Sequence, residues 1–491
     1  MISQPTLGSR SRNIVFPALL VAGAFACFCD AAQSADAKPP NIVLFFVDNL
    51  GTGDIGCYGS TLHRTPHIDR LAAEGAKFTS FYVASGVCTP SRAALMTGCY
   101  PLRVDMHKSG EGVAVLRPLD TKGLNPKETT MAEVLHSVGY ATGIFGKWHL
   151  GDQPEFLPTQ QGFDTFFGIP YSDDMTKDLR PQLWPELPLM RDEQVIEAPV
   201  DRDLLVKRCT EEAIAFIEQN QERPFFVYIP HTMPGSTKRP FSSPAFQGKS
   251  KNGPYGDSVE ELDWSTGQVM ETLKRLDLDE QTLVIWTSDN GAPHRNPPQG
   301  SNLPYQGDGY NTSEGAMRMP CVMRWPGKIS AGQINDALCT TMDLLPTFGK
   351  LAGATMSKTE IDGHEISRIL LGESDTASPW DDKGFAFYYM DQLQAIRAGR
   401  WKLYLPLDPK TGLRLPPAAS KEGNVALYDV RNDVHEDQEV SAEHPDVVAH
   451  LTDLAQQIRR EIGDVRQVGT GRREAGKVKD PQPLVLDKSV P

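Results

Sequence analysis

Four short apolar segments of the sequence each end abruptly at polar residues. They cover residues 41–47, 140–146, 225–230 and 283–288. Such runs lack an alternation of apolar and polar positions, which is typical of strands in a parallel sheet that is buried on both faces. We therefore predict that these segments form strands of one parallel sheet.

Apolar residues at helical spacing lie between the predicted strands, over residues 131–138 and 259–276. Strands that alternate with helices predict a doubly wound α/β fold, in which ligands bind at the carboxyl ends of the strands. The polar residues that follow the four strands should therefore meet at one edge of the sheet. These residues are Asp48, Asn49, Lys147, His149, His231, Asp289 and Asn290.

The pattern changes after about residue 375. Residues 385–390, 394–398 and 401–405 are typical of short antiparallel strands, and residues 447–462 place apolar side chains on one helix face. We expect a large α/β domain followed by a small α+β domain. The expected division is 1–34 as a signal peptide, 39–375 as the large domain, 380–465 as the small domain and 466–491 as a polar tail, disordered or draped over the rest.

The first 34 residues have the features of a secretory signal peptide in the usual order. Arg10 and Arg12 occur without an acidic neighbour, an apolar run extends from Ile14 to Phe28, and small and polar residues follow. That run is short for a membrane span. We predict an exported protein, periplasmic or extracellular, without a transmembrane domain. The alternatives are a retained anchor and lipoprotein processing at Cys27.

The composition is ordinary for a globular protein, but the charge balance narrows the choice of partners. Of 491 residues, 40% are hydrophobic, and 63 acidic against 49 basic residues give a net charge of −14. Nucleic-acid-binding proteins usually carry a basic surplus, so we expect no nucleic-acid partner. Eight cysteines, two of them in the signal peptide, are too few for a disulfide framework in a chain of this length.

The sequence Cys88-Thr89-Pro90-Ser91-Arg92 is the most informative motif of the chain. By itself it also fits a buried structural cysteine beside a helix that begins at Pro90. The stretch resembles the maturation signature of the type I sulfatases, in which the cysteine is oxidised to formylglycine (3-oxoalanine). Six further segments resemble motifs of that family, in a layout most similar to its arylsulfatase A branch: 48–59, 146–151, 168–172, 255–267, 287–291 and 325–327.

The resemblance implies an alkaline-phosphatase-like catalytic domain over residues 39–375, with a mixed, mostly parallel sheet between helices. It implies a secreted sulfuric ester hydrolase that removes sulfate from a sulfated sugar, a polysaccharide or an aryl sulfate. Formylglycine, made from Cys88 by a maturation system, would be the nucleophile. Its hydrate offers one hydroxyl to attack sulfur and a second whose loss of a proton expels sulfate, so covalent catalysis splits one step into two.

The resemblance also implies a metal site at the ends of two of the strands. Asp48, Asn49, Asp289 and Asn290, together with oxidised Cys88, would bind Ca²⁺ or Mg²⁺, because hard oxygen ligands select such cations. The cation would polarise the sulfate. A single aspartate at a strand end is often only a cap or turn residue. Two Asp-Asn pairs on either side of Cys88 in the sequence favour the metal site.

Three basic residues would surround the sulfate. The resemblance assigns this role to Arg92, Lys147 and His149, as preorganised charges and hydrogen-bond donors. If Pro90 begins a helix, the amides of its first turn would also favour an anion beside Cys88. Without the motif, Lys147 and His149 would be interpreted as members of a solvated loop.

The chain departs from the family pattern at two positions that bear on the metal and on maturation. Asn49 stands where relatives more often have Asp. The missing negative charge should weaken the affinity for the cation or allow a more anionic substrate to bind. Thr97-Gly98-Cys99 stands where the signature commonly closes with Thr-Gly-Arg, which should slightly affect maturation.

Two further departures remove groups that relatives place near the leaving oxygen. Gly235 stands where relatives have the second His of an HTMPH motif, and Gly309 stands where they have a Lys. His231 either substitutes for that His or packs behind the site. Other candidate donors are His294, Lys238 and Arg295. A general acid contributes about 10²–10⁴-fold, so its loss would slow catalysis rather than abolish it.

Two other functions remain open at this point. The changes at Gly235 and Gly309 also fit a catalytically weakened homologue that binds sulfated glycans. A phosphomonoesterase or phosphodiesterase of the same superfamily is a further alternative. That enzyme would be expected to carry a Ser or Thr nucleophile and more His and Asp metal ligands, so Cys88 in its motif argues against it.

Overall fold

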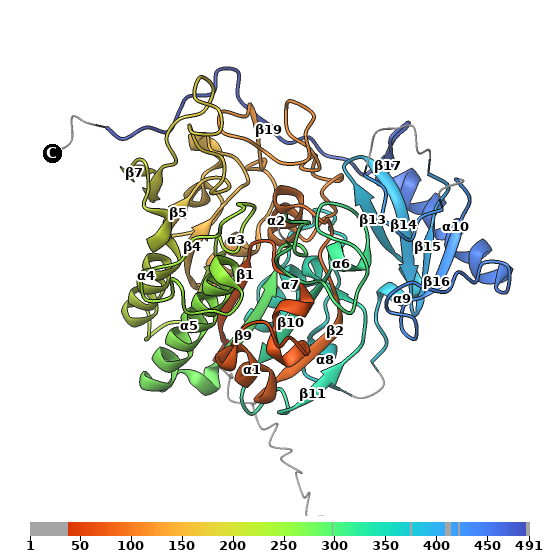
Figure 1. Ribbon diagram of the computed structural model, residues 1–491, viewed down its shortest axis with the longest axis horizontal. Coiled ribbons are helices and arrows are strands. Elements are labelled where there is room, and N and C mark those ends of the chain that lie inside the picture. The colour runs from red at the N-terminus through yellow and green to blue at the C-terminus, as the bar shows by residue number, and fades with distance from the viewer. Residues whose placement is uncertain (1–37, 297, 374–375, 408–413, 421–422, 488–491) are drawn as a thin grey trace, which may run out of the picture. The chain divides into compact units, whose positions relative to one another are not determined.

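Strand β1 (Asn41–Val47) lies in the interior of a large mixed sheet, between two parallel neighbours (Figure 1). All of its side chains are buried. Ile42, Leu44 and Phe46 belong to the hydrophobic core on one face of the sheet. The intervening side chains, Val43, Phe45 and Val47, belong to the core on the other face. The unbroken apolar run of β1 therefore follows from burial on both sides.

The structure is a computed structural model. It describes residues 38–487 except 297, 374–375, 408–413 and 421–422. The expected signal peptide over residues 1–34, and with it lipoprotein processing at Cys27, lies outside the described residues. Within the described part of the chain, no helix has both the length and the apolar character needed to cross a bilayer.

The predicted strands are confirmed as neighbours in one sheet. β9, β1, β8 and β4 run parallel to one another, whereas β10 is antiparallel to β9 and β2. In order across the sheet, the strands are β11 (Gln333–Asn335), β2 (Ala76–Tyr82), β10 (Arg318–Arg324), β9 (Thr282–Ser288), β1, β8 (Phe225–Ile229), β4 (Ala141–Lys147), β5 (Thr165–Ile169), β6 (Leu189–Arg191) and β7 (Gln194–Glu197), with β12 (Cys339–Thr340) also paired to β2.

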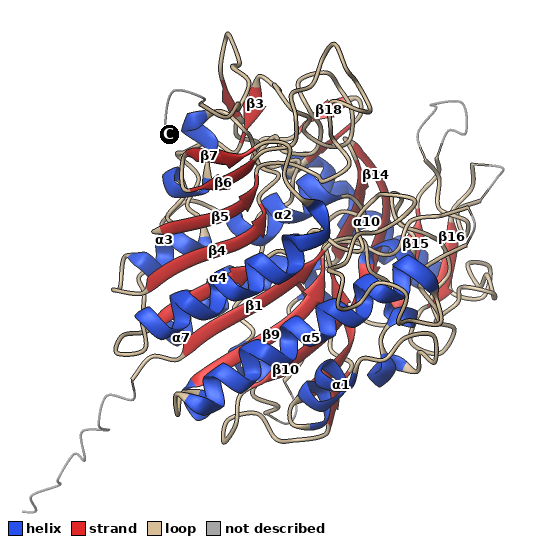
Figure 2. Ribbon diagram, turned by 60° about the vertical axis from the view of Figure 1, so that its left-hand side comes forward, coloured by secondary structure: helices blue, strands red, loops and turns tan. Residues whose placement is uncertain are grey.

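Helices cover both faces of this sheet, and in Figure 2 α4 and α5 lie side by side in front of the strands. The helices on that face are α1 (Pro66–Ala73), α4 (Leu205–Gln219) and α5 (Gly253–Arg275), and those on the other face are α2 (Cys88–Thr97), α3 (Met131–His136) and α7 (Leu344–Ala352). The predicted helices over 131–138 and 259–276 correspond to α3 and α5. Helix α5 begins earlier than predicted, with Pro254 in its first turn.

A smaller antiparallel sheet follows the large one, as the sequence pattern predicts. Its strands, in order, are β13 (Phe385–Tyr389), β14 (Gln392–Ala398), β15 (Trp401–Tyr404) and β16 (Ala426–Asp429). Helix α10 (Pro445–Glu461) packs on β14 and β15. Strand β16 has no counterpart among the predicted elements. The exact division into two domains stays a prediction, since residues from Pro39 onward cluster as one compact unit.

The C-terminal tail folds back and forms a separate two-stranded sheet with a segment from the N-terminal half of the chain. Strand β19 (Gly476–Lys477) pairs with β3 (Lys122–Gly123), and the Arg473 guanidinium donates to the Glu128 carboxylate at 2.8 Å. The described part of the tail is therefore draped over the large domain. The remaining short elements are β17 (Gly463–Asp464), β18 (Gln467–Val468), α6 (Glu314–Met317), α8 (Ser367–Leu370), α9 (Trp380–Lys383) and single 3₁₀ turns at 52–54, 56–58, 154–156, 158–160, 202–204, 279–281 and 341–343.

Candidate active site at the carboxyl ends of the strands

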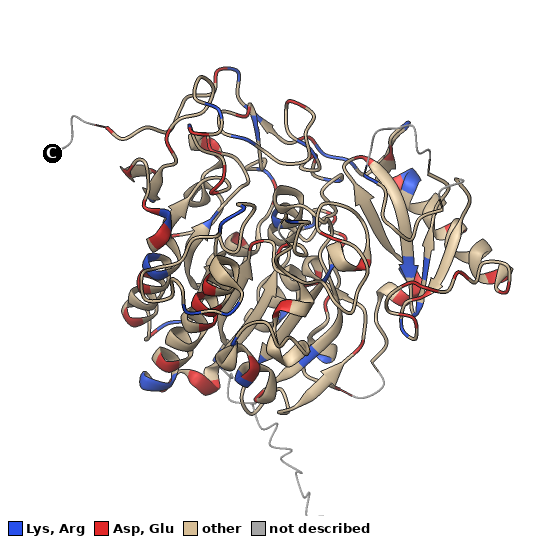
Figure 3. Cartoon of the chain, viewed as in Figure 1, with Lys and Arg blue, Asp and Glu red and all other residues tan. Residues whose placement is uncertain are grey.

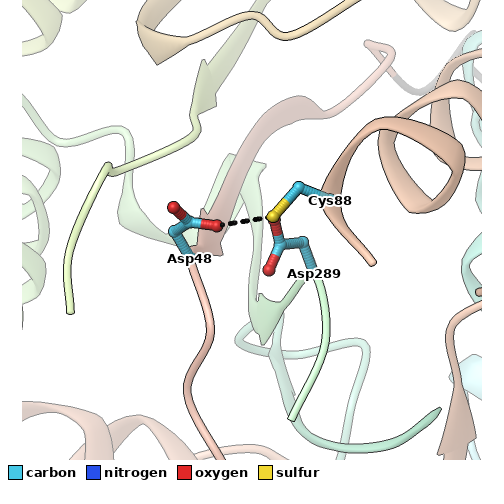
Figure 4. Close-up of side chains that lie close together, drawn as sticks. All are labelled: Asp48, Cys88 and Asp289. Carbon is cyan, nitrogen blue, oxygen red and sulfur yellow. Dashed lines mark hydrogen bonds between the residues drawn. The ribbon is translucent and has the colours of Figure 1, made fainter. Parts of the chain in front are cut away.

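Asp48, Cys88 and Asp289 come together where the central strands end (Figure 4). Asp48 directly follows β1, and Asp289 directly follows β9, its parallel neighbour. Cys88 is the first residue of α2. One ligand atom from each of the three lies within 4.8 Å of the other two, and all three residues are buried.

Cys88 occupies the amino-terminal end of α2. The helix begins at Cys88 and not at Pro90, so the expected start is two residues late. Pro90 is tolerated inside the first turn because amides there have no partner within the helix. The Cys88 sulfur lies 3.2 Å from Asp48 Oδ1, and the residue is 4% exposed. This sulfur marks where the oxygens of an oxidised side chain would stand.

Lys147 neutralises Asp48 on one side of the cysteine. Lys147 is the last residue of β4, and its ammonium donates to Asp48 Oδ2 at 2.9 Å and to Ser172 Oγ at 3.3 Å. Burial alone would raise the pKa of Asp48, yet Lys147 and Arg92 lower it to about 2. Asp48 is therefore a carboxylate at neutral pH.

Arg92 neutralises Asp289 on the other side. Its guanidinium donates to Asp289 Oδ2 through Nε at 3.1 Å and Nη2 at 2.7 Å, and to the Lys147 carbonyl at 3.0 Å. Burial, followed by the charge of Asp48, raises the pKa of Asp289 to about 7. Two buried carboxyl groups and two buried cations thus hold one another in place around Cys88.

Amide oxygens from both Asp-Asn pairs complete a set of oxygen donors. The Asn49 backbone amide donates to Asp289 Oδ1 at 3.0 Å, and Asn290 Nδ2 donates to Asn49 Oδ1 at 2.5 Å. Asn290 Oδ1 is buried and has no hydrogen-bond partner among the described residues. A buried oxygen without a partner is costly unless something binds it. The donor set of Asp48, Asn49, Asp289 and Asn290 therefore fits a hard cation such as Ca²⁺.

His149 lies beside Cys88 and is neutral. Its Nε2 lies 3.0 Å from the Leu116 carbonyl, so Nε2 carries the hydrogen and Nδ1 is left without a hydrogen-bond partner among the described residues. Burial, helped by Lys147 and Arg92, lowers the pKa of His149 well below its usual value. His149 also has a left-handed backbone, with φ of 64°, a strained conformation that often occurs at functional sites.

The structure does not bring His231 to this group. His231 is buried, and its Nε2 lies 2.8 Å from Ser265 Oγ on α5. Burial lowers the pKa of His231 to about 3, so the ring is neutral. It does not belong to the lining of the pocket above Cys88. Of the two positions proposed for it, the structure favours packing behind the site.

A pocket of about 180 Å³ opens above Cys88. Its polar lining includes His149, Ser172, Asp174, Ser236, Tyr310 and Arg414. The sequence motifs did not identify the last four of these as site residues. A signal for two of them was nevertheless present, because Ser236 follows Gly235 and Tyr310 follows Gly309, the two glycines that depart from the family pattern.

A family model for sulfatases matches residues 40–354, well over half of the chain. The chain belongs to the sulfatase family. A second model, for the C-terminal part of N-sulphoglucosamine sulphohydrolase, matches residues 309–464 of the sulfatase. Human arylsulfatase A is 41% identical to it over 398 residues, which are 76% of each of the two proteins.

Solved structures of sulfatases have the same fold. BT33336S-sulf, from work on the metabolism of multiple glycosaminoglycans by Bacteroides thetaiotaomicron, is 29% identical with a TM-score of 0.72, over 86% of the sulfatase and 100% of that chain. The PsFucS1 sulfatase from Pseudoalteromonas sp. is 26% identical with a TM-score of 0.74, over 86% and 90%. The sulfatase thus has the expected alkaline-phosphatase-like α/β fold with a small C-terminal part, and it is a sulfuric ester hydrolase.

Proposed function

We propose that this sulfatase removes sulfate from a sulfated sugar or polysaccharide, or from an aryl sulfate, with a formylglycine made from Cys88 as its nucleophile. The observation that carries the proposal is the buried cluster of Asp48, Cys88 and Asp289 at the strand ends, next to Arg92 and Lys147. A hydrated formylglycine supplies an oxygen nucleophile for sulfur and a second hydroxyl whose loss of a proton releases sulfate.

The residues around position 88 are suited to hold an anionic ester. Lys147 and Arg92 are fully buried, so their charges act in a medium of low dielectric constant. The amides in the first turn of α2 favour negative charge at the same place. His149 is neutral and has a free Nδ1 lone pair, which accepts a hydrogen bond from a hydroxyl beside position 88.

We further propose that Asp48, Asn49, Asp289 and Asn290 hold Ca²⁺, with Mg²⁺ as the alternative, together with the oxidised side chain of residue 88. The unpartnered Asn290 Oδ1 and the crowding of two carboxylates support this set. The cation would draw electron density from the sulfate oxygens. It would also separate the charges of Asp48 and Asp289.

Export and maturation belong to the same proposal. The features of residues 1–34 support transport to the periplasm or the outside of the cell, and the motif at Cys88 requires a formylglycine-generating system in the host. The glycosaminoglycan context of BT33336S-sulf favours a sulfated polysaccharide, or a sugar derived from one, as the natural substrate.

The first test is mass spectrometry of the peptide that contains Cys88, on protein purified from its native host. We expect formylglycine at that position. A free thiol in every preparation would contradict the proposed nucleophile.

The second test measures the release of sulfate from 4-nitrophenyl sulfate and from a panel of sulfated glycans. We expect activity in the wild type and none in Cys88→Ala, because that variant has no nucleophile. Addition of EDTA should lower both the activity and the melting temperature, and Ca²⁺ should restore both. If EDTA changes neither, the proposed metal ligands are wrong.

A further inference from the structure

Three departures from the family pattern lie in or directly beside one hydrogen-bonded chain above Cys88. Asn49 replaces an Asp, and its side-chain Nδ2 donates to Ser236 Oγ at 3.0 Å. Ser236 directly follows Gly235. Its hydroxyl lies 2.8 Å from the hydroxyl of Tyr310, which directly follows Gly309. Ser236 and Tyr310 both line the pocket that contains Cys88.

The directions of these hydrogen bonds leave one O–H for the pocket. Asn49 Oδ1 accepts from Asn290, so Asn49 Nδ2 is the group that faces Ser236. An aspartate at this position would have no hydrogen to donate. Once Ser236 accepts from Asn49, its own hydrogen is available to the oxygen of Tyr310. The Tyr310 hydrogen can then point toward a ligand in the pocket.

The backbone holds Tyr310 in an unusual conformation. Its φ is 74°, in the left-handed region that a bulky aromatic residue rarely adopts, and its amide donates to the Gly86 carbonyl at 2.8 Å. Gly86 lies two residues before Cys88. A strained residue of this kind costs about 1–3 kcal/mol and persists only where its surroundings impose it. Tyr310 is therefore tied directly to the loop that leads into α2.

The two glycines leave no room for the side chains that relatives carry there. At Gly235, with φ of 67°, a Cβ atom would lie 2.7 Å from the Thr232 carbonyl and 2.9 Å from Asp173 Oδ1. At Gly309, a Cβ atom would lie 2.4 Å from the Gly291 carbonyl. Each loop therefore has space only for glycine at this position. The side chains of the following residues, Ser236 and Tyr310, line the pocket.

The other side chains considered as proton donors to the leaving oxygen do not reach the pocket. His231 faces α5, and the Arg295 guanidinium donates to backbone carbonyls of the loop at 235–237. Lys238 is exposed, and the side chain of His294 is 80% exposed beside Asp308. None of these four candidates belongs to the described lining of the pocket.

We propose that the Tyr310 hydroxyl donates a proton to the leaving oxygen of the sulfate ester, and that Ser236 and Asn49 position it. The proposal rests on the proposed chemistry at residue 88. As the nucleophilic oxygen at that residue bonds to sulfur, the bond between sulfur and the alcohol oxygen breaks. Its electron pair stays on that oxygen, which takes the Tyr310 proton and departs as a neutral alcohol. The nucleophilic hydroxyl gives up its own proton to water as it bonds to sulfur, and water that enters the vacated pocket returns a proton to Tyr310, so that no net charge remains.

The proton matters most when the departing group is a poor leaving group. A sugar alkoxide or an unsubstituted phenolate is strongly basic and needs a donor, whereas 4-nitrophenolate leaves readily without one. The loss of Tyr310 should therefore change the dependence of the rate on the leaving group. A residue with a merely structural role would slow all esters alike.

The test compares kcat/KM of Tyr310→Phe and wild type on phenyl sulfate and on 4-nitrophenyl sulfate. We expect a loss of about 100-fold or more on phenyl sulfate and of less than about threefold on 4-nitrophenyl sulfate. Ser236→Ala should show the same selectivity with a smaller loss. Tyr389→Phe, which removes the other tyrosine hydroxyl of the pocket, is the matched control and should affect both esters equally.

The outcomes separate the two proposals. If the wild type cleaves both esters and Tyr310→Phe lowers both equally, the role of Tyr310 is wrong and the proposed function stands. If wild type that carries formylglycine cleaves neither ester nor any sulfated glycan, both proposals are wrong. Melting temperatures close to the wild-type value show that the variants are folded.

Discussion

Asn49 connects the proposed metal ligands to the hydroxyl groups of Ser236 and Tyr310. Its Oδ1 lies on the side of Cys88 and Asn290, and its Nδ2 lies on the side of Ser236. Its φ of 64° belongs to the left-handed region, which asparagine tolerates better than most residues. Compared with the Asp of the family pattern, Asn49 has one negative charge fewer and one hydrogen-bond donor more.

This exchange predicts opposite effects of Asn49→Asp on the cation and on catalysis. The added charge should tighten Ca²⁺ binding by about tenfold, because ligand charge sets much of the affinity of such sites. The variant should also lose activity on phenyl sulfate more than on 4-nitrophenyl sulfate, since Ser236 no longer receives a hydrogen. Calorimetric titration with Ca²⁺ and the two kcat/KM values check these outcomes. Unchanged Ca²⁺ affinity would contradict the assignment of Asn49 as a ligand.

At the scale of the element, helix α5 carries a carboxyl group, that of Glu261, whose pKa is raised by burial. Glu261 Oε2 accepts from the Ser243 amide at 2.9 Å, whereas Oε1 is buried without a partner among the described residues. Burial raises the pKa of Glu261 from 4.5 to about 7. Glu261 loses its proton at a lower pH in the unfolded chain than in the folded protein. Between pH 4.5 and about 7, the folded protein therefore holds a proton that the unfolded chain has lost.

Glu261 should therefore make the protein less stable as the pH rises from about 4.5 to about 7. The loss should reach up to about 3 kcal/mol and stay constant above that range. Glu261→Gln keeps an acceptor for Ser243 and cannot ionise, so this variant should be more stable than wild type at pH 8 and equal to it at pH 4.5. Urea unfolding at several pH values measures the difference. Parallel curves for the two proteins would contradict the assignment.

The sequence predicts the strands that have a clear pattern of apolar and polar residues of their own. It does not predict strands that form only through pairing with a distant segment of the chain. The ends of β1, β4, β8 and β9 follow from apolar runs that stop at polar residues. Strand β16 forms only because β15 lies beside it, and no pattern within its own four residues identifies it.

The same distinction applies within the site. Asp48, Lys147 and Asp289 could be placed because strand ends meet at one edge of the sheet. Ser236 and Tyr310 could not, because their contact depends on how two loops close around glycines.

At the scale of the whole molecule, buried charges join the small sheet to the large one. Glu314 of α6 accepts from Lys402 of β15 at 2.8 Å and from Arg318 of β10 at 3.2 Å. Burial alone would raise the pKa of Glu314, yet Lys402 and Arg318 lower it to about 2. The link is electrostatic, and its members come from both sheets.

Lys402→Met should therefore destabilise the whole protein, because it leaves the buried Glu314 charge without its closest charged partner. We expect a loss of about 3–5 kcal/mol in the free energy of unfolding. Lys108→Met is the matched control, because Lys108 forms a half-exposed ion pair with Asp391 at 3.1 Å across the same two parts, and its removal should cost less than about 1 kcal/mol. Urea unfolding checks both values, and equal losses would refute the role of the buried link.

The net charge of −14 is a property of the surface and not of the site. Figure 3 shows acidic and basic residues interspersed along the chain. In the proposed function, the attraction for an anionic ester comes instead from Arg92, Lys147 and the start of α2, all of them buried next to Cys88. Long-range steering therefore contributes little, and capture of the substrate depends on the pocket itself.

The return of the C-terminal tail has a consequence for how the protein is made. Asn125 donates to the Glu474 carbonyl across 349 positions of the sequence, and the Val478 amide donates to Thr121. The same loop supplies the Leu116 carbonyl that orients His149. Residues 474 and 478 are synthesised long after this loop, so the loop beside the active site gains this support only after they have emerged from the ribosome. The loop that holds His149 in place therefore lacks this support while most of the chain is being made.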